Sequence, residues 1–294
     1  MSYRKEKFKS LLGVNTNQLD LESLKKFSQT ALLNGMHGLC FSPYQEGQEP
    51  GDFISEAQIR RKLELILPYT KWIRTFSCTE GNELIPVLAK EYGLKTLVGA
   101  WLGDDPEVNA AEINGLIKLC KAGYVDVAAV GNEVMYRGDL EEDQLIKFIE
   151  QVKHEISEIP VGYVDAYYEF TDRPKITAAC DVILANCYPY WEGCSLEYSL
   201  IYMKQMFEQA RAAGQGKKVI ITETGWPSQG ASLEGAHPSY ENALKYFINA
   251  QSWSQQADIE MFYFSSFDES WKVDSEGDVG AFWGLWDKDE NLKF

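Results

Sequence analysis

Histidine is scarce in this chain, and several short motifs that mark other enzyme classes do not occur. The three histidines are His37, His154 and His237, and none stands at the C-terminal end of an expected strand, which disfavours a Ser-His-Asp triad. The sequence contains no G-x-S-x-G, no G-x4-G-K-[ST] and no H-E-x-x-H, and no G-x-G-x-x-G follows its first expected strand. These absences argue against a hydrolase elbow, a phosphate-binding loop, a zinc protease and a dinucleotide fold. We therefore expect neither a metal nor a cofactor.

Long apolar runs are also missing. Nothing approaches the roughly 18 consecutive apolar residues of a membrane helix. The first twelve residues, Met1 to Leu12, include basic side chains but lack the apolar stretch and the small-residue cleavage site of a secretory signal. We expect a cytoplasmic protein, or a secreted one if a leader has been removed.

The cysteines form no recognisable motif. Six are present, and no two of them make a C-x-x-C pair, so buried free thiols are the expectation for a chain without an export signal. Pairing of Cys187 with Cys194 stays open. The seven-residue spacing of Cys180, Cys187 and Cys194 matches no zinc motif.

Positive charge is in the minority. Lys and Arg number 28 against 44 Asp and Glu, a formal net charge of −16 with a pI of about 4.7. Such a surface repels phosphate backbones and anionic lipids, which disfavours nucleic acid and membranes as partners, whereas a neutral glycan meets no such repulsion. Aromatic residues make up 13% of the chain, and flat rings near a cleft suit the apolar faces of sugars.

Short apolar segments alternate with longer stretches of helical periodicity along the whole length. The expected strands are residues 38–42, 72–76, 96–100, 125–130, 161–164, 182–185, 218–222 and 260–265, and the expected helices are 20–33, 56–67, 82–92, 106–121, 141–156, 195–213 and 239–256. This alternation predicts a single α/β domain, 1–294, folded as a (β/α)8 TIM barrel with its active site at the C-terminal ends of the strands. Residues 1–35 would form an N-terminal extension with a helix that packs on the barrel.

Two glutamates stand at the C-terminal ends of expected strands. Glu133 follows the fourth apolar segment and Glu223 the seventh, so a barrel would bring both carboxylates to the same face despite the distance between them in the sequence. A carboxylic acid that protonates the leaving oxygen and a carboxylate that attacks the sugar are what retaining cleavage of a glycosidic bond requires. The chain is thus predicted to be a glycosidase.

The residues around these acids resemble those of a known family. Val-Gly-Asn-Glu (130–133) and Thr-Glu-Thr-Gly-Trp-Pro-Ser (222–228) are similar to the two signatures of glycoside hydrolase family 17, the β-1,3-glucanase family. Further blocks occur in the family's order at 41–50, 73–76, 186–190, 267–272 and 284–287, so the resemblance spans roughly residues 36–294. The first two blocks resemble bacterial members.

The resemblance assigns roles to individual residues. It implies that Glu133 is the general acid/base and Glu223 the nucleophile, that Asn132 donates a hydrogen bond to a sugar 2-hydroxyl, and that Tyr188 orients the nucleophile. Asn132 as a turn cap and Tyr188 as a core residue remain open alternatives. The other residues that the resemblance places at the substrate are Tyr44, Trp226, Phe267, Glu269, Trp271 and Lys272. Glu269 and Lys272 could instead form a surface ion pair. Trp101, Tyr136 and Trp191 are further candidates for stacking on sugars, and Arg74 is expected behind the site, holding a carboxylate.

The expected function is a retaining hydrolase of β-1,3-glucosidic bonds in laminarin-type glucans or gluco-oligosaccharides. Exo and endo attack are equally compatible with the sequence, a β-1,3-glucanosyltransferase is an alternative within the same chemistry, and a non-catalytic glucan-binding barrel is an alternative of another class. An insertion around residues 188–196 could close one end of the cleft. The sequence indicates no oligomeric state.

Overall fold

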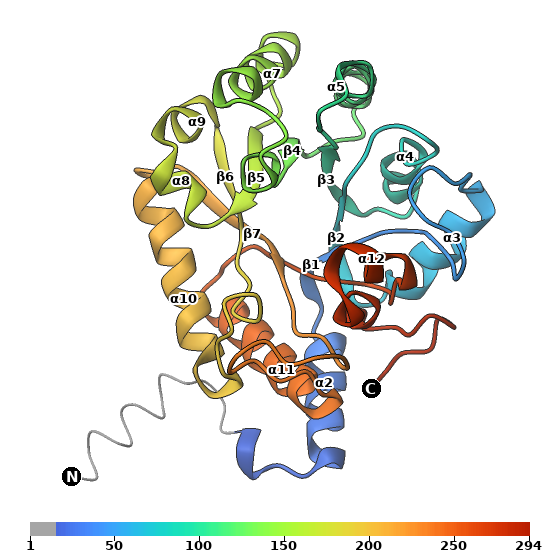
Figure 1. Ribbon diagram of the computed structural model, residues 1–294. Helices are drawn as coiled ribbons and strands as arrows, with labels where there is room; N and C mark the ends of the chain where they lie inside the picture. The colour runs from blue at the N-terminus through green and yellow to red at the C-terminus, as the bar shows by residue number, and fades with distance from the viewer. Residues whose placement is uncertain (1–15) are drawn as a thin grey trace.

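Eight parallel strands, paired in sequence order, close into a barrel in the computed structural model, which describes residues 16–294 (Figure 1). The predicted (β/α)8 TIM barrel is therefore confirmed. The strands are β1 (Met36–Cys40), β2 (Thr70–Thr75), β3 (Lys95–Ala100), β4 (Val127–Asn132), β5 (Val161–Ala166), β6 (Val182–Asn186), β7 (Lys218–Thr224) and β8 (Met261–Tyr263).

Each predicted strand overlaps an observed one, with ends within two residues of those expected, and β8 is shorter than expected at both ends. The sequence predicts a strand over 260–265, but β8 ends at Tyr263 because the following residues pair elsewhere. The amide of Ser265 donates to Trp283 O at 3.1 Å, and that of Ser266 donates to Cys40 O at 3.0 Å. The chain after β8 is thus held by the C-terminal segment and by the end of β1.

Several of the expected helices begin at side-chain caps that the sequence supplies. Ser55 accepts from the Gln58 amide at the start of α3, Asp105 accepts from the first amides of α5, which has proline at its first turn, and Ser239 accepts from Asn242 at the start of α11. The helices around the barrel are α3 (Glu56–Ile66), α4 (Leu84–Glu91), α5 (Pro106–Lys121), α7 (Glu142–Glu155), α10 (Leu196–Ala213) and α11 (Tyr240–Gln256).

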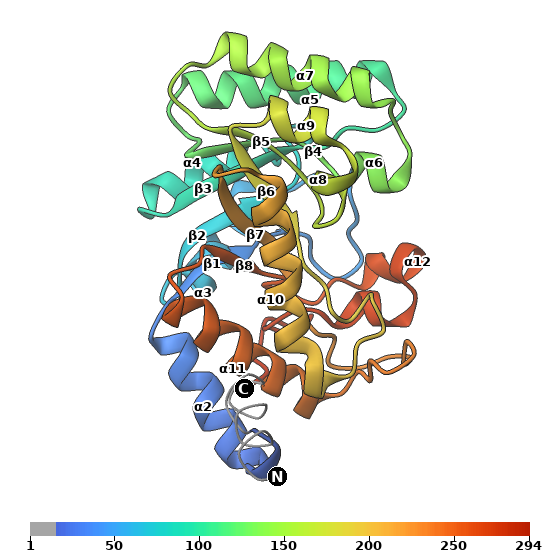
Figure 2. The same ribbon diagram turned by 90° about the vertical axis from the view of Figure 1, so that its left-hand side faces the viewer.

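Several short elements have no counterpart in the sequence prediction. They are η1 (Thr16–Gln18), α6 (Val134–Arg137), α8 (Glu169–Asp172), α9 (Pro174–Ala179), η2 (Ser270–Lys272), α12 (Val273–Glu276) and η3 (Asp278–Phe282). Most are too short to show a 3.6-residue apolar period, which is why pattern reading misses them. In Figure 2, α6, α8 and α12 project from the same side of the barrel, the side to which the strands point their C-terminal ends.

The helix that precedes the barrel is α2 (Leu21–Leu33), and it packs along α11 (Figure 1). Leu24 is fully buried and forms a small apolar cluster with Leu244 and Ile248, with Phe294 at its edge. The first fifteen residues of the predicted N-terminal extension lie outside the described residues.

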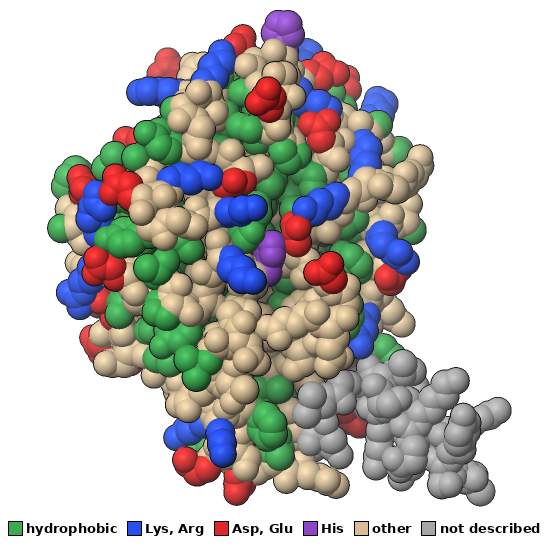
Figure 3. Space-filling model, turned by 180° about the vertical axis from the view of Figure 1, so that it is seen from behind, with side chains coloured by type: hydrophobic (Ala, Val, Ile, Leu, Met, Phe, Trp, Pro, Cys, Tyr) green, Lys and Arg blue, Asp and Glu red, His purple; other side chains and the backbone are tan. Residues whose placement is uncertain are grey.

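The opposite end of the barrel is a mixed-charge face. Ion pairs join Lys90 to Asp126 at 2.7 Å, Lys153 to Asp181 at 2.6 Å and Lys218 to Glu260 at 2.6 Å, and each places an acid or a base near the start of a strand. Figure 3, which views the molecule from behind, shows basic and acidic side chains interspersed over this face. Across residues 16–294, no helix combines the length and apolar character needed to span a membrane.

Candidate active site

Glu133 occupies an unusual backbone position directly after β4. Its φ is 52°, in the left-handed region, and it follows Gly131 with a φ of 85°. A non-glycine residue there costs roughly 1–2 kcal/mol, and two backbone hydrogen bonds hold the turn: Glu133 N donates to Val164 O at 2.8 Å and Arg137 N donates to Glu133 O at 2.9 Å. Oε1 of Glu133 accepts from Asn186 Nδ2 at 2.8 Å.

The environment of Glu133 favours its protonated form. Burial of the carboxyl raises its pKa to about 7, and the negative charge of Glu223 adds to that rise, while the hydrogen bond from Asn186 opposes it. At neutral pH a substantial fraction of this side chain therefore carries a proton. A carboxyl in this state can protonate a leaving oxygen.

Glu223 has the opposite environment, because a cation faces it. It lies at the C-terminal end of β7 with 5% of its surface exposed. The guanidinium of Arg74 lies 2.7 Å from Oε1, and the Tyr188 hydroxyl donates to Oε2 at 2.7 Å. An ion pair and a phenol donor together stabilise an ionised carboxylate and fix its orientation.

Arg74 also contacts the residue beside the other acid. Its Nη2 donates to Oδ1 of Asn132 at 2.6 Å, which fixes the oxygen end of that amide toward Arg74. Arg74 is 2% exposed and its guanidinium lies 4.2 Å from the centre of the Phe76 ring. The predicted position of Arg74 behind a carboxylate agrees with these contacts.

Asn186 links the two acids and was not assigned a role from the sequence. It ends β6, its Cα pairs in register with that of Glu223 on β7, and its amide donates to Glu133. The Thr222 hydroxyl donates to Oδ1 of Asn186 at 2.8 Å and thereby fixes which end of the amide faces Glu133. The rule that singled out the glutamates, a polar residue ending an apolar strand, applies to Asn186 equally.

The segment after β8 contributes a buried ion pair. Lys272 Nζ lies 2.5 Å from Oε2 of Glu269 and 4.1 Å from the centre of the Phe264 ring, and both charged side chains are nearly closed off from solvent. The Trp271 indole donates to Oε1 of Glu269 at 3.1 Å. Of the two alternatives for Glu269 and Lys272, a surface ion pair is excluded by this burial.

Glu276 of α12 is a further acid near the site, and sequence reasoning did not find it. Its Oε2 accepts from the Trp283 indole at 2.8 Å, and burial raises its pKa to about 7, against the opposing charge of Lys272. Nothing in the surrounding sequence marks it, because α12 is a single short turn with no apolar strand directly before it.

The predicted aromatic residues divide into exposed and buried groups. Trp226 and Phe267 are 1% and 2% exposed and pack in the core, Trp226 against Tyr190 and Tyr246 and Phe267 against Trp286, so neither presents a free face to a sugar. Tyr44 is also buried, with its hydroxyl accepting from Asn82 and its ring against the edge of the partly exposed Trp271. The exposed rings are Trp101, Tyr136 and Trp191, at 40%, 63% and 41%.

Two loops meet at the predicted insertion. The amide of Gly235 donates to Gly193 O at 3.0 Å, and Trp191 packs against Trp283 at 5.5 Å between ring centres. The six cysteines are free thiols, including Cys187 and Cys194.

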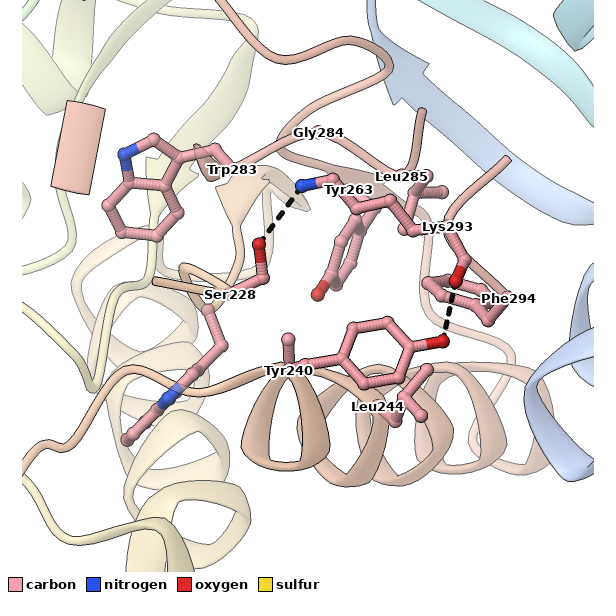
Figure 4. A pocket seen from close by; sticks show the side chains of 11 residues that line it. Ser228, Tyr240, Leu244, Tyr263, Trp283, Gly284, Leu285, Lys293 and Phe294 are labelled. Atoms are coloured by element: carbon pink, nitrogen blue, oxygen red, sulfur yellow. Dashed lines mark hydrogen bonds between the residues drawn. The ribbon is translucent and has the colours of Figure 1, made fainter. Parts of the chain in front are cut away.

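A small cavity lies beside this site, between the end of β8, α11 and the C-terminal residues (Figure 4). Lys293 closes one wall, donating to Ser228 Oγ at 3.0 Å and to Asp268 at 2.7 Å, and the Tyr240 hydroxyl donates to Lys293 O. Neither Glu133 nor Glu223 lines this cavity. Within residues 16–294, no three His, Cys, Asp or Glu side chains are grouped to hold a metal ion.

A carboxyl whose pKa is raised to about 7 and an ion-paired carboxylate therefore share the C-terminal mouth of a (β/α)8 barrel. Residues 38–284 match the family model described as the BtgE/BtgC glycoside hydrolase domain. The chain belongs to this family. It is thus a glycoside hydrolase, as the sequence predicted.

Curated relatives and solved structures agree with that assignment. The chain is 28% identical over 258 residues to the glucan 1,3-beta-glucosidase BGL2 of Candida albicans, covering 79% of this chain and 83% of the relative. It is 26% identical over 269 residues to the glucan 1,3-beta-glucosidase of Saccharomyces cerevisiae, covering 83% and 86%. The crystal structure of the glycoside hydrolase family 17 beta-1,3-glucanosyltransferase of Rhizomucor miehei superposes with a TM-score of 0.78 at 29% identity, covering 88% of this chain and 96% of that one.

Proposed function

We propose that this glycoside hydrolase cleaves β-1,3-glucosidic bonds in glucans or gluco-oligosaccharides with retention of configuration. Glu223 is the nucleophile and Glu133 the general acid/base. The observation that carries this proposal is the contrast between the two carboxyl environments: Arg74 lies 2.7 Å from Glu223, whereas burial raises the pKa of Glu133 to about 7. Double displacement needs one carboxyl that can hold a proton and a second that is oriented to attack the sugar.

The reaction follows in two steps. Glu223 attacks the anomeric carbon as the glycosidic C–O bond breaks, and the proton of Glu133 passes to the departing oxygen. Water then gives its proton to the now ionised Glu133 and displaces Glu223 from the sugar. Asn132, with its Oδ1 held by Arg74 at 2.6 Å, directs its amide nitrogen to the 2-hydroxyl of the sugar bound between the acids.

The β-1,3-glucan substrate class is supported by the relatives. The curated proteins of Candida albicans and Saccharomyces cerevisiae are named glucan 1,3-beta-glucosidases. An active-site mutant of the Rhizomucor miehei enzyme, 28% identical to this chain, has been solved in complex with laminaritriose. The exposed rings of Trp101, Tyr136 and Trp191 suit an uncharged β-1,3-linked oligomer, whose sugar faces can stack on them.

The direct test of the roles is azide rescue of alanine variants. With an aryl glycoside that has a good leaving group, Glu223→Ala should be inactive and should form the α-glycosyl azide when azide is added. Glu133→Ala should form the β-glycosyl azide through the glycosyl-enzyme. Glu107→Ala, on the exposed first turn of α5, is the matched control and should retain wild-type turnover without forming any azide product. Undiminished laminari-oligosaccharide cleavage by Glu223→Ala contradicts the assignment.

Transfer to a sugar hydroxyl is a second candidate, favoured by one observation. Trp101, Tyr136 and Trp191 expose their rings, and Trp101 is backed by Arg137 at 4.6 Å from its ring centre. Rings of this kind could hold an acceptor sugar in place of water. A product time course on laminarihexaose separates the outcomes: glucose alone indicates exo attack, mixed short oligomers endo attack, and products longer than the substrate transfer.

A non-catalytic glucan-binding barrel has less support, because a binder requires neither the Arg74–Glu223 ion pair nor a protonated Glu133. The resemblance of the first sequence blocks to bacterial members stays a prediction.

A further inference from the structure

The helix that follows the acid/base residue lacks the usual cap. Glu133 is the N-cap residue of α6, yet its side chain makes no hydrogen bond to the first amides of that helix. An N-cap side chain ordinarily accepts from the second or third amide. Here the carboxylate turns into the mouth of the barrel, toward Asn186. The amides of α6 therefore need acceptors from elsewhere.

Strand β5 supplies those acceptors. The hydroxyl of Tyr163 accepts from the Met135 amide at 2.8 Å, and Oδ2 of Asp165 accepts from the Tyr136 amide at 3.3 Å. The Tyr163 hydroxyl in turn donates to Oδ2 of Asp165, while Oδ1 accepts from the Ala166 amide at 2.7 Å. The neighbouring strand thus performs the capping that Glu133 would otherwise perform.

The side chains of Tyr163 and Asp165 are fully buried, both at 0% exposed. Tyr163 packs against Phe170 at 6.3 Å between ring centres and lies under Gly131, where an added Cβ would meet its ring at 3.4 Å. A buried acid of this kind is costly unless hydrogen bonds satisfy it. The backbone turn at Glu133 is itself in a left-handed conformation that its surroundings must maintain.

The charge of Asp165 also reaches the acid/base residue. Its carboxylate raises the pKa of Glu133, after burial and Glu223, and burial in turn raises the pKa of Asp165 to about 6. Arg74 on β2 opposes the effect on Glu133, and Glu169 on α8 faces Asp165 and Tyr163. The hydroxyls of Tyr188 and Tyr168 also lie near Glu133 and Asp165, respectively. Arg173, between α8 and α9, lies near Tyr163.

We propose that Tyr163 and Asp165 are positioning residues of the glycosidase reaction: they cap α6 from β5, so that the carboxyl of Glu133 is free to face the scissile bond. This proposal rests on the proposed function, in which Glu133 delivers the proton. It requires that the pair act only on the step that needs that proton.

The test compares two substrates with Tyr163→Phe and Asp165→Asn. One is a β-1,3-linked oligosaccharide, whose sugar leaving group needs an acid. The other is a dinitrophenyl glycoside, whose leaving group departs without one. We expect kcat/KM on the oligosaccharide to fall by about 10- to 100-fold, the usual consequence of a misplaced catalytic group, with KM within about twofold. On the dinitrophenyl glycoside, kcat/KM should stay near wild type.

The pH profile is an independent readout for Asp165→Asn. Because the substitution removes a negative charge near Glu133, the pKa of that acid should fall. The alkaline limb of kcat/KM on the oligosaccharide should then move to lower pH. Two variants serve as controls. Tyr240→Phe removes a tyrosine hydroxyl that donates to Lys293 O and controls for the loss of a phenol. Leu24→Ala loosens the packing of α2 and controls for lost stability.

A purely structural role for the pair gives a different pattern. Equal losses of kcat/KM on both substrates, or a loss that merely follows the melting temperature as in Leu24→Ala, would overturn the positioning role. An unmoved alkaline limb in Asp165→Asn would count against the electrostatic part. Glu133→Ala, measured in parallel, separates the positioning role from the acid/base assignment. If kcat/KM of Glu133→Ala also shows no dependence on the leaving group, it is the assignment of Glu133 as acid/base that fails, and not the positioning role of Tyr163 and Asp165.

Discussion

Replacing Arg74 by methionine tests whether one cation organises both halves of the site. Arg74 is 2% exposed, lies 2.7 Å from Glu223 and 2.6 Å from Asn132, and stacks on Phe76. Methionine fills a similar length without charge, and it leaves the Glu223 carboxylate buried without a counterion. Removing one partner of a buried pair costs about 3–5 kcal/mol, so we expect the free energy of unfolding at pH 7 to fall by that amount.

Activity should fall more steeply than stability explains. Without the guanidinium, Glu223 either remains an uncompensated charge or takes up a proton, and Asn132 loses the contact that orients its amide. We expect kcat/KM on laminarihexaose to drop at least about 100-fold in the folded protein. Arg74→Lys keeps the charge but cannot reach both partners as a fork, so it should lose less stability and still be impaired.

The assay is urea unfolding of a double-mutant cycle. Arg74→Met should cost much less in a Glu223→Gln background, because the stranded charge is then absent. Arg60→Met, which breaks a surface pair with Glu91 at 2.7 Å, is the control and should leave unfolding and turnover close to wild type. The same cost for Arg74→Met in both backgrounds, or no measurable cost at all, would refute the reasoning.

Three further predictions concern other parts of the chain. Tyr188→Phe removes the 2.7 Å hydrogen bond to Glu223 and should lower kcat about tenfold; steady-state kinetics with unchanged kcat would contradict it. Leu24→Ala should lower the free energy of unfolding in urea by about 2–5 kcal/mol, because Leu24 is fully buried against Leu244, whereas an unchanged value would mean that α2 contributes no stability. Burial lowers the pKa of His37 from 6.5 to about 4, so the unfolded chain takes up this proton at a higher pH than the folded chain. The free energy of unfolding should therefore fall as the pH decreases from about 6.5 to about 4. His37→Phe should abolish this part of the pH dependence of unfolding, and a slope that persists in the variant would assign the pH dependence to other groups.

The strands were predictable because most are short, largely apolar runs that are buried on both faces over most of their length. The expected strand 161–164, for example, carries no charged residue, and β5 begins where expected, at Val161. The region between β5 and β6 was not predictable. Its helices α8 and α9 have four and six residues, which is less than two helical turns and gives no periodic signal.

Candidate site residues were predictable where a polar side chain ends a strand, as Glu133 and Glu223 do. Whether an aromatic near such an end faces the cleft depends on loop conformation, which local sequence leaves open. Trp226 lies three residues after Glu223 and is core, whereas Trp101, directly after β3, is exposed. Asp165 sits within its strand, so its role emerges only from its contact with the α6 amides.

The barrel has a seam at β8. This strand has three residues, and it pairs with β1 in the register Gly38↔Phe262 and Leu39↔Tyr263. An added Cβ at Gly38 would lie 2.4 Å from the Phe262 ring, so the join tolerates no side chain on that glycine. Because so few hydrogen bonds join β8 to β1, we expect local opening of the barrel to occur most readily between these two strands. The segment that carries Glu269 and Lys272 follows this joint, so its place beside the strand ends depends on the hydrogen bonds from Ser265 to Trp283 and from Ser266 to Cys40.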